Sequence, residues 1–490
     1  MNKHIIVVGA GIAGLTAGIY ARRCGFDVTM IEQHSIVGGM CTSWKRKGYL
    51  FEGAMHWLTG SKPGSGIHQI WLDTGALADG VDISLDDPFT GVEYNGETVY
   101  LYRDIEKTTA GLLRLSPEDA PLIRRLVKEV KALSKMDMPI FDVKGVKTKN
   151  LQKMSLGFLF KILPALPTMG RTSNISVKEY IAQFSHPAIR QLLQVVPGEY
   201  QASSLLFTLA TLYKGDGGHP AGGSLPFVTR MEKAFRDLGG TLLLKSKVDK
   251  VMIQNGTVTG VWLADRVLNA NTVIVTQETI AANNALFDVP LQAPWLNFIC
   301  KNAKSTIFNC VCLGVKAKLP AVIPTWTLKT PIFYAGKTIT TLSFHSYSGH
   351  GYAPEGCTAL TTGFLDDTYD FWRQAKEEGR YAAEKEALGV QVVAALNEKY
   401  PETTGRVEII DVATPLTYER YTGAYRGAWM TPIGTGEKMQ NYLGIVDNVQ
   451  GLYFAGHRLR PPGGLPAAAA SGRDAIQLVC KQYGATFYSN

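Results

Sequence analysis

Three glycines near the start of the chain place the tightest constraint on how this sequence folds. They have the spacing G-x-G-x-x-G and follow a short apolar run: Gly9, Gly11 and Gly14, with Ile12 and Ala13 inside the loop. The run before them, His4–Val8, predicts a buried strand. The residues after them, Ala13–Cys24, predict a helix that ends at Gly25, and Asp27–Ile31 predicts a second strand. The chain therefore opens with a strand–loop–helix–strand unit.

Each glycine of this loop is needed for a different physical reason. Gly9 allows the tight turn out of the strand, Gly11 lets the backbone approach a pyrophosphate without a Cβ in the way, and Gly14 lets the helix approach the sheet closely. Free backbone N–H groups and the positive end of the helix dipole then face the phosphates. Glu32 follows at the end of the second strand, where a carboxylate accepts the ribose hydroxyls and repels a 2′-phosphate. The unit predicts a dinucleotide other than NADP.

A second glycine pair narrows the dinucleotide to FAD. Gly38 and Gly39 come soon after Glu32 and are followed by Met40. A backbone without side chains suits close passage along the phosphates and ribityl chain of FAD. An NAD dehydrogenase would continue into another helix and strand at this point. No second G-x-G-x-x-G with a strand and a helix around it follows in the sequence.

The rest of the sequence alternates between two kinds of secondary-structure pattern. Strand and helix signals like those of the first unit return near residue 219 and again at the C-terminal end. The predicted fold is α/β, with a Rossmann-like FAD-binding domain interleaved with an α+β substrate domain. We expect residues 1–70, 215–285 and 416–490 to form the first domain, and residues 71–214 and 286–415 to form the second.

Composition limits the partners and the compartment. The chain has 490 residues, 46% hydrophobic and 19% charged, which is ordinary for a globular protein of this length. The net charge of +8 favours anionic partners, but no dense basic tract interleaved with aromatics indicates nucleic acid. Seven scattered cysteines without a CxxC pair predict reduced thiols in the cytoplasm, and the histidines show no metal-ligand spacing. We expect no metal site.

Further motifs carry a resemblance to a known family. The glycine loop, Glu32 and the Gly38–Gly39 pair resemble the N-terminal signature of the two-dinucleotide-binding-domain flavoproteins. Three later stretches are similar to segments of phytoene desaturases, carotenoid isomerases and retinol saturases: Lys47–Gly53, Pro220–Ser224, and the C-terminal run from Gly451 through Pro466 to Arg473. The resemblance covers the cofactor domain and says little about residues 71–214 and 286–410.

The resemblance implies that Gly9, Gly11 and Gly14 hold the pyrophosphate and that Glu32 holds the adenosine ribose. It also implies further cofactor contacts. Val248 would lie along the adenine by its backbone, and Gly456 would approach the phosphates or the ribityl chain. Gly464, Leu465 and Pro466 would lie at the isoalloxazine ring. A helix that begins near Leu465 would also direct its positive end at the ring, which stabilises negative charge on the reduced flavin.

The predicted activity is flavin-dependent redox or isomerisation at carbon–carbon double bonds of a hydrophobic polyene, isoprenoid or acyl chain. His56, Tyr425 and His457 are the candidates for handling the proton that accompanies a hydride. Arg458 and Arg460 lie beside these motifs, and their charges motivate the hypothesis of a substrate carboxylate. Two alternatives stay open: an amine oxidase-like flavoenzyme, and a non-catalytic lipid-binding escort protein of related fold. The electron partner is not indicated.

One apolar segment raises the question of a membrane. Residues 151–166 are mostly apolar and are flanked by lysines, but they are too short to span a bilayer. Two interpretations are open: an element that dips into one leaflet from the inner face of a membrane, and a core helix of the substrate domain.

Overall fold

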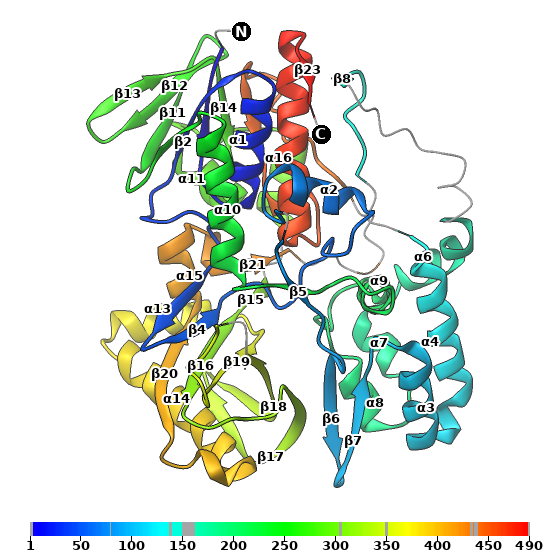
Figure 1. Ribbon diagram of the computed structural model, residues 1–490. Coiled ribbons are helices and arrows are strands. Elements are labelled where there is room, and N and C mark those ends of the chain that lie inside the picture. The colour runs from blue at the N-terminus through cyan, green and yellow to red at the C-terminus, as the bar shows by residue number, and fades with distance from the viewer. Residues whose placement is uncertain are drawn as a thin grey trace.

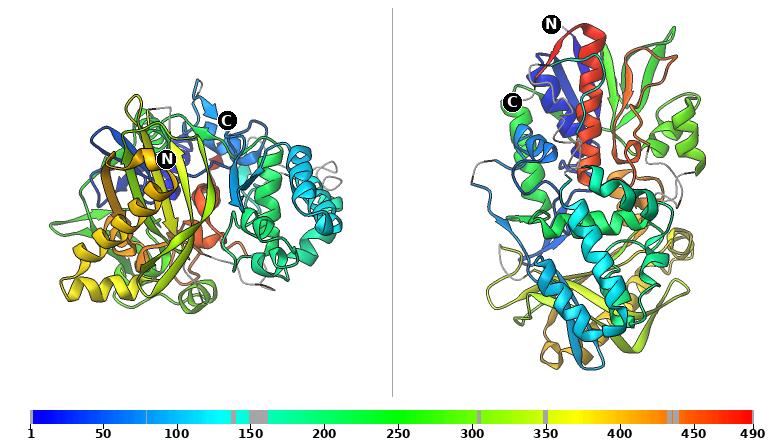
Figure 2. Two further views of the ribbon diagram at one scale, coloured as in Figure 1. Left: turned by 90° about the horizontal axis from the view of Figure 1, so that it is seen from below. Right: turned by 90° about the vertical axis from the view of Figure 1, so that its right-hand side faces the viewer.

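The chain folds around two sheets that stand one above the other, with a bundle of helices beside the lower one (Figure 1). The computed structural model describes residues 3–78, 80–136, 140–148, 162–302, 306–347, 351–431, 435 and 440–488. Viewed from below, the lower sheet with its helices (yellow and orange) and the helical bundle (cyan and teal) lie side by side (Figure 2).

The upper sheet is five-stranded, parallel, and ordered β10-β2-β1-β14-β22. Its strands come from three distant parts of the chain: β1 (His4–Val8), β2 (Asp27–Ile31), β10 (Thr241–Leu243), β14 (Thr272–Val275) and β22 (Leu452–Phe454). Successive residues of β1 face opposite layers. Ile5 and Val7 belong to the core that the helices cover, whereas Ile6 and Val8 belong to the core beneath an antiparallel three-stranded sheet.

Three helices cover one face of this sheet: α1 (Ile12–Arg23), α10 (Ser224–Asp237) and α16 (Gly464–Tyr483). The small sheet on the other face consists of β11 (Val248–Gln254), β12 (Thr257–Leu263) and β13 (Arg266–Asn269). Helices α1 and α16 lie side by side (Figure 1), and a Cβ added at Gly472 of α16 would come within 2.3 Å of the carbonyl oxygen of Ala13. The glycine in the C-terminal motif therefore allows this close contact between helices.

The lower sheet has seven strands in the order β20-β16-β19-β18-β17-β6-β7. The bounds are β6 (Thr90–Tyr94), β7 (Glu97–Leu101), β16 (Asn309–Val315), β17 (Val322–Tyr334), β18 (Lys337–Tyr347), β19 (Thr358–Phe364) and β20 (Val407–Ala413). Three helices accompany it: α13 (Tyr369–Glu377), α14 (Tyr381–Lys399) and α15 (Pro415–Thr422). Along β18, Leu342 is buried in the core beneath α14, whereas its neighbour Ser343 and then His345 line a cavity. The period of two in a strand thus separates core from site.

The bundle beside this sheet is made of short helices with a core of their own. They are α3 (Ile105–Leu115), α4 (Ala120–Leu133), α6 (Leu166–Thr172), α7 (Val177–Ile181), α8 (Pro187–Leu192) and α9 (Ala202–Tyr213). Helix α9 has two faces: Leu205 and Leu209 are buried in this core, while Phe207 and Thr208 line the cavity.

Shorter elements join the two parts. They are β3 (Ser43–Arg46), β4 (Tyr49–Glu52), α2 (Gly66–Asp73), β5 (Ile83–Ser84), β8 (Lys147–Thr148), β9 (His219–Pro220), α11 (Thr279–Ala285), α12 (Pro294–Asn302), β15 (Thr306–Ile307), β21 (Ala428–Met430) and β23 (Thr486–Phe487). The 3-10 turns are η1 (Pro117–Asp119), η2 (Leu163–Ala165), η3 (Pro401–Thr403), η4 (Tyr425–Gly427) and η5 (His457–Leu459).

The predicted fold class is confirmed, and its first and last elements lie within a residue or so of their predicted bounds. The predicted strands His4–Val8 and Asp27–Ile31 are β1 and β2, and the expected helix from Leu465 begins one residue earlier. The apolar segment 151–166 lies mostly outside the described residues, which resume at 162. No helix among the described residues is long and apolar enough to cross a membrane. All seven cysteines are free, five of them buried.

Candidate active site

One cavity of about 1050 Å³ extends from the glycine loop of the upper domain to the lower sheet and the helical bundle. Nearly every residue predicted to contact FAD lines it: Gly9, Gly11, Ile12, Ala13, Glu32, Gly38, Gly39, Met40, Val248, Gly456, Gly464, Leu465 and Pro466. These residues come from the carboxyl ends of the parallel strands β1, β2 and β22, from two helix N-termini, from the loop after β2 and from the start of β11. The fold thus gathers at one place the motifs that lie at both ends of the chain.

The glycine loop forms a cradle of bare backbone. Gly9 has a φ of +102°, which only glycine adopts readily, and its amide donates to the carbonyl of Ile31. Gly11 forms a backbone bridge with Gly38. A Cβ on Gly11 would meet the oxygen of Gly38 only at 3.8 Å, so space remains in front of this backbone. Helix α1 begins at this point without a side-chain cap or an acidic residue in its first turn. The N-terminus is open to an anion.

Gly14 plays a different part from the other two glycines. It is absent from the cavity wall, and a Cβ there would lie 2.0 Å from the carbonyl oxygen of Gly9. Its hydrogen therefore permits close contact between α1 and the loop, as expected for the third glycine of the motif. The expectation that Gly14 itself holds the pyrophosphate is corrected, because the residue faces protein.

Glu32 stands at the end of β2 with its carboxylate fixed by backbone amides. Ala10 N–H donates to Oε2 at 2.8 Å and His34 N–H donates to Oε1 at 2.8 Å. The side chain is buried yet lines the cavity. Each oxygen retains a lone pair, so the carboxylate is oriented to accept ribose hydroxyls. Ser246 N–H donates to the backbone carbonyl of Glu32, which places the start of β11 and Val248 beside it.

The C-terminal motif forms the opposite wall of the cofactor end. Gly456 N–H donates to the hydroxyl of Ser471 at 2.9 Å, and a Cβ on Gly456 would meet nothing within 4 Å. Helix α16 begins at Gly464 without a side-chain cap or an early acidic residue, and its first turn lines the cavity. Two open helix N-termini thus face one cavity, which suits a dinucleotide with a pyrophosphate at one end and an electron-accepting ring at the other.

The remainder of the cavity is mostly apolar. Its wall in the helical bundle and the adjoining strands consists chiefly of hydrophobic side chains: Phe89, Val92, Leu133, Met136, Met169, Leu192, Val195, Val196, Tyr200 and Phe207. The cavity is therefore longer than a site for the cofactor alone, and this extension suits an apolar chain.

The three candidates for proton handling are placed differently. His56 and His457 line the cavity, whereas Tyr425 does not and is 40% exposed. The lowered pKa of His457, about 4, follows from burial and then from Arg458. A Cβ on Gly463 would meet its Nδ1 at 2.9 Å, so the ring supports the loop before α16. Tyr425 lies in η4 and is not among the cavity-lining residues, so a role in proton handling stays a prediction for it.

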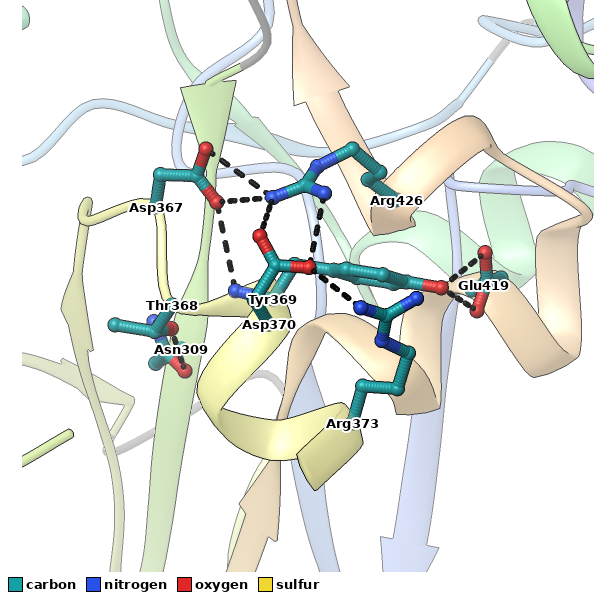
Figure 3. A network of polar contacts seen from close by, with 8 residues as sticks. All are labelled: Asn309, Asp367, Thr368, Tyr369, Asp370, Arg373, Glu419 and Arg426. Carbon is teal, nitrogen blue, oxygen red and sulfur yellow. Dashed lines mark hydrogen bonds and ion pairs between the residues drawn. The ribbon is translucent and has the colours of Figure 1, made fainter. Parts of the chain in front are cut away.

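Arg426, beside Tyr425, anchors this turn to the lower domain. Figure 3 shows its guanidinium between two carboxylates, with Nη2 donating to Asp370 at 2.9 Å and to Asp367 at 3.1 Å. The guanidinium also lies over the ring of Tyr369, whose hydroxyl donates to Glu419 at 2.9 Å. Ala424 and Ala428, on either side of the turn, line the cavity. Arg426 thus fixes a cavity wall from outside.

Arg458 and Arg460 are both paired within the protein. Arg458 is 1% exposed, bonds Glu278 through Nε, and donates to Thr431 Oγ1 at 3.0 Å. Arg460 bonds the buried carboxylate of Asp474. Both arginines border the cavity, but each already has an anion beside it. Their charges are compensated inside the fold, so these ion pairs lend no support to the hypothesis that the two arginines bind a substrate carboxylate.

Several wall residues had no signal in the local sequence. Thr276 donates to the carbonyls of Val8 and Gly9, and so fixes the glycine loop from β14. His345 projects into the cavity from β18, and His219 borders it from β9. A single histidine in an alternating strand carries no motif. Only the pairing of distant strands brings these side chains to the site.

The buried Glu52, within the segment similar to the desaturases, offers a test of the site's electrostatics. It accepts from Ser224 N–H at 2.9 Å, and burial raises its pKa from 4.5 to about 7. Between these values the folded state keeps a proton that the unfolded state has released. The free energy of unfolding therefore falls as pH rises, by about 3 kcal/mol in all.

We expect Glu52→Gln to remove this pH dependence. Its melting temperature relative to wild type should rise steadily from pH 5 to pH 8, because the amide keeps the hydrogen bond without the buried charge. Glu377→Gln, at an exposed position, is the matched control. Parallel curves for wild type and Glu52→Gln would contradict the burial argument.

Comparison with known proteins identifies the family. The model of the family "Flavin containing amine oxidoreductase" matches residues 12–480. The chain belongs to this family. It is thus an FAD-dependent oxidoreductase, as the glycine loop and the C-terminal motif predict.

Curated relatives are distant. A phytoene desaturase (neurosporene-forming) of Cereibacter sphaeroides is 23% identical over 96% of this chain and 94% of its own. An all-trans-retinol 13,14-reductase of Danio rerio is 21% identical over 86% and 76%. A lycopene-forming phytoene desaturase of Paracoccus sp. is 27% identical, and the match spans only 55% of this chain and 54% of that one. Among solved structures, a putrescine oxidase bound to putrescine aligns with a TM-score of 0.62 at 16% identity, over 98% and 99% of the chains. That likeness shows the fold.

Proposed function

We propose that this oxidoreductase acts on carbon–carbon double bonds of a hydrophobic polyene, isoprenoid or acyl substrate, by desaturation, saturation or cis–trans isomerisation. The observation that carries the proposal is the apolar extension of the cavity from the cofactor end into the helical bundle. The curated relatives that match most of this chain include a desaturase and a reductase named for polyene substrates, which supports it.

The residues would divide the work between cofactor and substrate. Gly9, Gly11 and the N-terminus of α1 would hold the pyrophosphate, and Glu32 would hold the ribose. Bound FAD supplies a hydride acceptor or donor at N5. The N-terminus of α16 would stabilise negative charge on the reduced flavin ring. The apolar wall would bind the hydrophobic substrate and exclude water. We propose His56 as the group that exchanges a proton with substrate at a ring nitrogen.

Flavin absorbance tests the proposal directly. The FAD-loaded protein is mixed without oxygen with polyenes, isoprenoids and acyl chains, first with oxidised and then with pre-reduced flavin. A substrate should bleach the oxidised flavin or restore colour to the reduced flavin, or else emerge as a different double-bond isomer. Putrescine and cyclohexylamine serve as the comparison. If amines alone change the flavin, the proposal fails in favour of the amine oxidase alternative.

Contact with a membrane surface is a separate proposal. Two leucines at the described end of the apolar segment are exposed, Leu163 by 57% and Leu166 by 49%. We expect co-sedimentation with liposomes, stronger with anionic lipid because of the net charge of +8.

Replacing both leucines by aspartate should weaken partitioning about tenfold or more, since each buried leucine contributes roughly 1.5–3 kcal/mol. Val289→Asp, at a residue 73% exposed, is the control. If wild type does not sediment with either lipid, the surface contact is wrong.

A further inference from the structure

One side chain gives the cavity an uncharged hydrogen-bonding point in its lower wall. His345 lies in β18, whose neighbours β17 and β19 pair with it through Val322 and Thr361. Its side chain is exposed to the cavity and forms no hydrogen bond with any residue that the structure describes. Ser343, two residues earlier on the same strand, also lines the cavity.

The ring of His345 is held in place by a second histidine. His56 stacks on it with ring centroids 4.3 Å apart and planes inclined by 16°. Phe308 lies edge-on to His56, with ring centroids 6.2 Å apart. A stacked ring has a defined orientation, so its nitrogens present hydrogen-bonding sites at fixed positions before a ligand arrives.

The charges around this point do not favour an ionic ligand. Asp86 is half exposed at the cavity and lies 3.5 Å from His219, and the guanidinium of Arg103 approaches the backbone of Asp86. Arg458 is already paired with Glu278. A substrate carboxylate near this point would therefore meet the carboxylate of Asp86.

The protonation state of His345 also favours an uncharged ligand. Although its side chain is open to the cavity, His345 lies deep inside the protein. This desolvation, and then His219, lower its pKa to about 4, so the ring is neutral near pH 7. A neutral imidazole has one N–H donor and one acceptor nitrogen. A hydroxyl matches both groups, a carbonyl matches the donor, and a pure hydrocarbon matches neither and gives the ring no hydrogen-bonding partner.

We propose that His345 hydrogen-bonds an uncharged oxygen of the substrate, a hydroxyl or a carbonyl, so that the cavity selects an oxygenated polyene or isoprenoid over the bare hydrocarbon. The inference rests on the proposed function and specifies its substrate class. His345 is a specificity residue in this scheme. The apolar remainder of the substrate lies along the helical wall.

The test uses four probes with one isoprenoid chain: geranylgeraniol and the corresponding hydrocarbon, carboxylic acid and amine. Binding to the FAD-loaded protein is followed by tryptophan fluorescence, since Trp57 lines the cavity. The alcohol should bind about tenfold tighter than the hydrocarbon, as one net hydrogen bond provides. His345→Phe keeps the stacked ring and should abolish the difference. His345→Gln keeps a donor and an acceptor and should retain much of it.

The outcomes separate this inference from the proposed function. Flavin content and thermal unfolding establish that each variant is folded. Equal affinity for alcohol and hydrocarbon in wild type, a preference unchanged in His345→Phe, or tightest binding of the acid or the amine would overturn the inference. If the hydrocarbon binds equally well and changes the flavin absorbance, only the inference fails. If no isoprenoid binds and none changes the flavin, the proposed function fails with it.

Discussion

Gly14→Ala should destabilise the fold, although alanine is usually the better residue in a helix. The added Cβ would lie 2.0 Å from the carbonyl oxygen of Gly9, which is fixed backbone, and 2.9 Å from Thr276 Oγ1, the hydroxyl that donates to the glycine loop. The gain in helix propensity is about 1 kcal/mol, and the overpacking costs about 3 kcal/mol or more. We expect a net loss that thermal unfolding of the flavin-free protein detects.

Gly11→Ala should behave in the opposite way. The nearest atoms to its Cβ are Gly38 O at 3.8 Å and Gly39 Cα at 4.0 Å, which are ordinary contacts. The flavin-free fold should therefore keep its melting temperature. The methyl group would hold the pyrophosphate away from the loop, and losing charge-assisted hydrogen bonds to backbone N–H groups should weaken FAD binding about a hundredfold.

Reconstitution with FAD separates the two glycines. Yellow colour after reconstitution measures binding, and unfolding without FAD measures the fold. If Gly11→Ala melts as early as Gly14→Ala, or binds FAD like wild type, the cradle is assigned wrongly.

The second large effect concerns the buried ion pair of Arg458 and Glu278. Glu278→Gln should lower the free energy of unfolding by about 3 kcal/mol or more, because it leaves a buried guanidinium without its anion. The glutamine still caps α11, where Oε2 of Glu278 accepts from Ala281 N–H at 2.9 Å. The loss therefore reports the charge and not the cap.

A double variant provides the control. Arg458→Met combined with Glu278→Gln removes both charges and should recover much of the stability, since an apolar replacement of a buried pair is often neutral. Chemical denaturation measures both proteins. A double variant no more stable than Glu278→Gln would show that the pair does not interact as described. Recovery would confirm that Arg458 is neutralised by the protein and not reserved for a substrate.

Local patterns predicted the cofactor end well. The strand, the glycine spacing and Glu32 lie within one short stretch, and each acts through backbone geometry that neighbouring residues set. The C-terminal loop and helix were equally readable, because glycines and alanines at a helix start have few alternative uses. The family comparison agrees with that prediction over residues 12–480.

The substrate end was much less predictable. Arg458 and Arg460 looked like free cations, yet their partners Glu278 and Asp474 come from other elements. Tyr425 looked close to the site, but Arg426 holds its turn against the lower domain (Figure 3). His345 had no local signal at all. Most of these deciding contacts join residues distant in sequence; the Arg460–Asp474 pair, fourteen residues apart, joins the loop before α16 to the helix itself.

The sequence by itself determined the cofactor, since the opening loop needs only glycines at fixed spacing to expose backbone N–H groups beside a helix start. The third of those glycines was assigned to the cofactor, and the tertiary structure showed that it serves contact between helix and loop. The tertiary structure also decided the chemistry of the substrate wall. Charge, protonation and hydrogen bonding there depend on which distant side chains share the cavity, and strand pairing and burial alone bring them together.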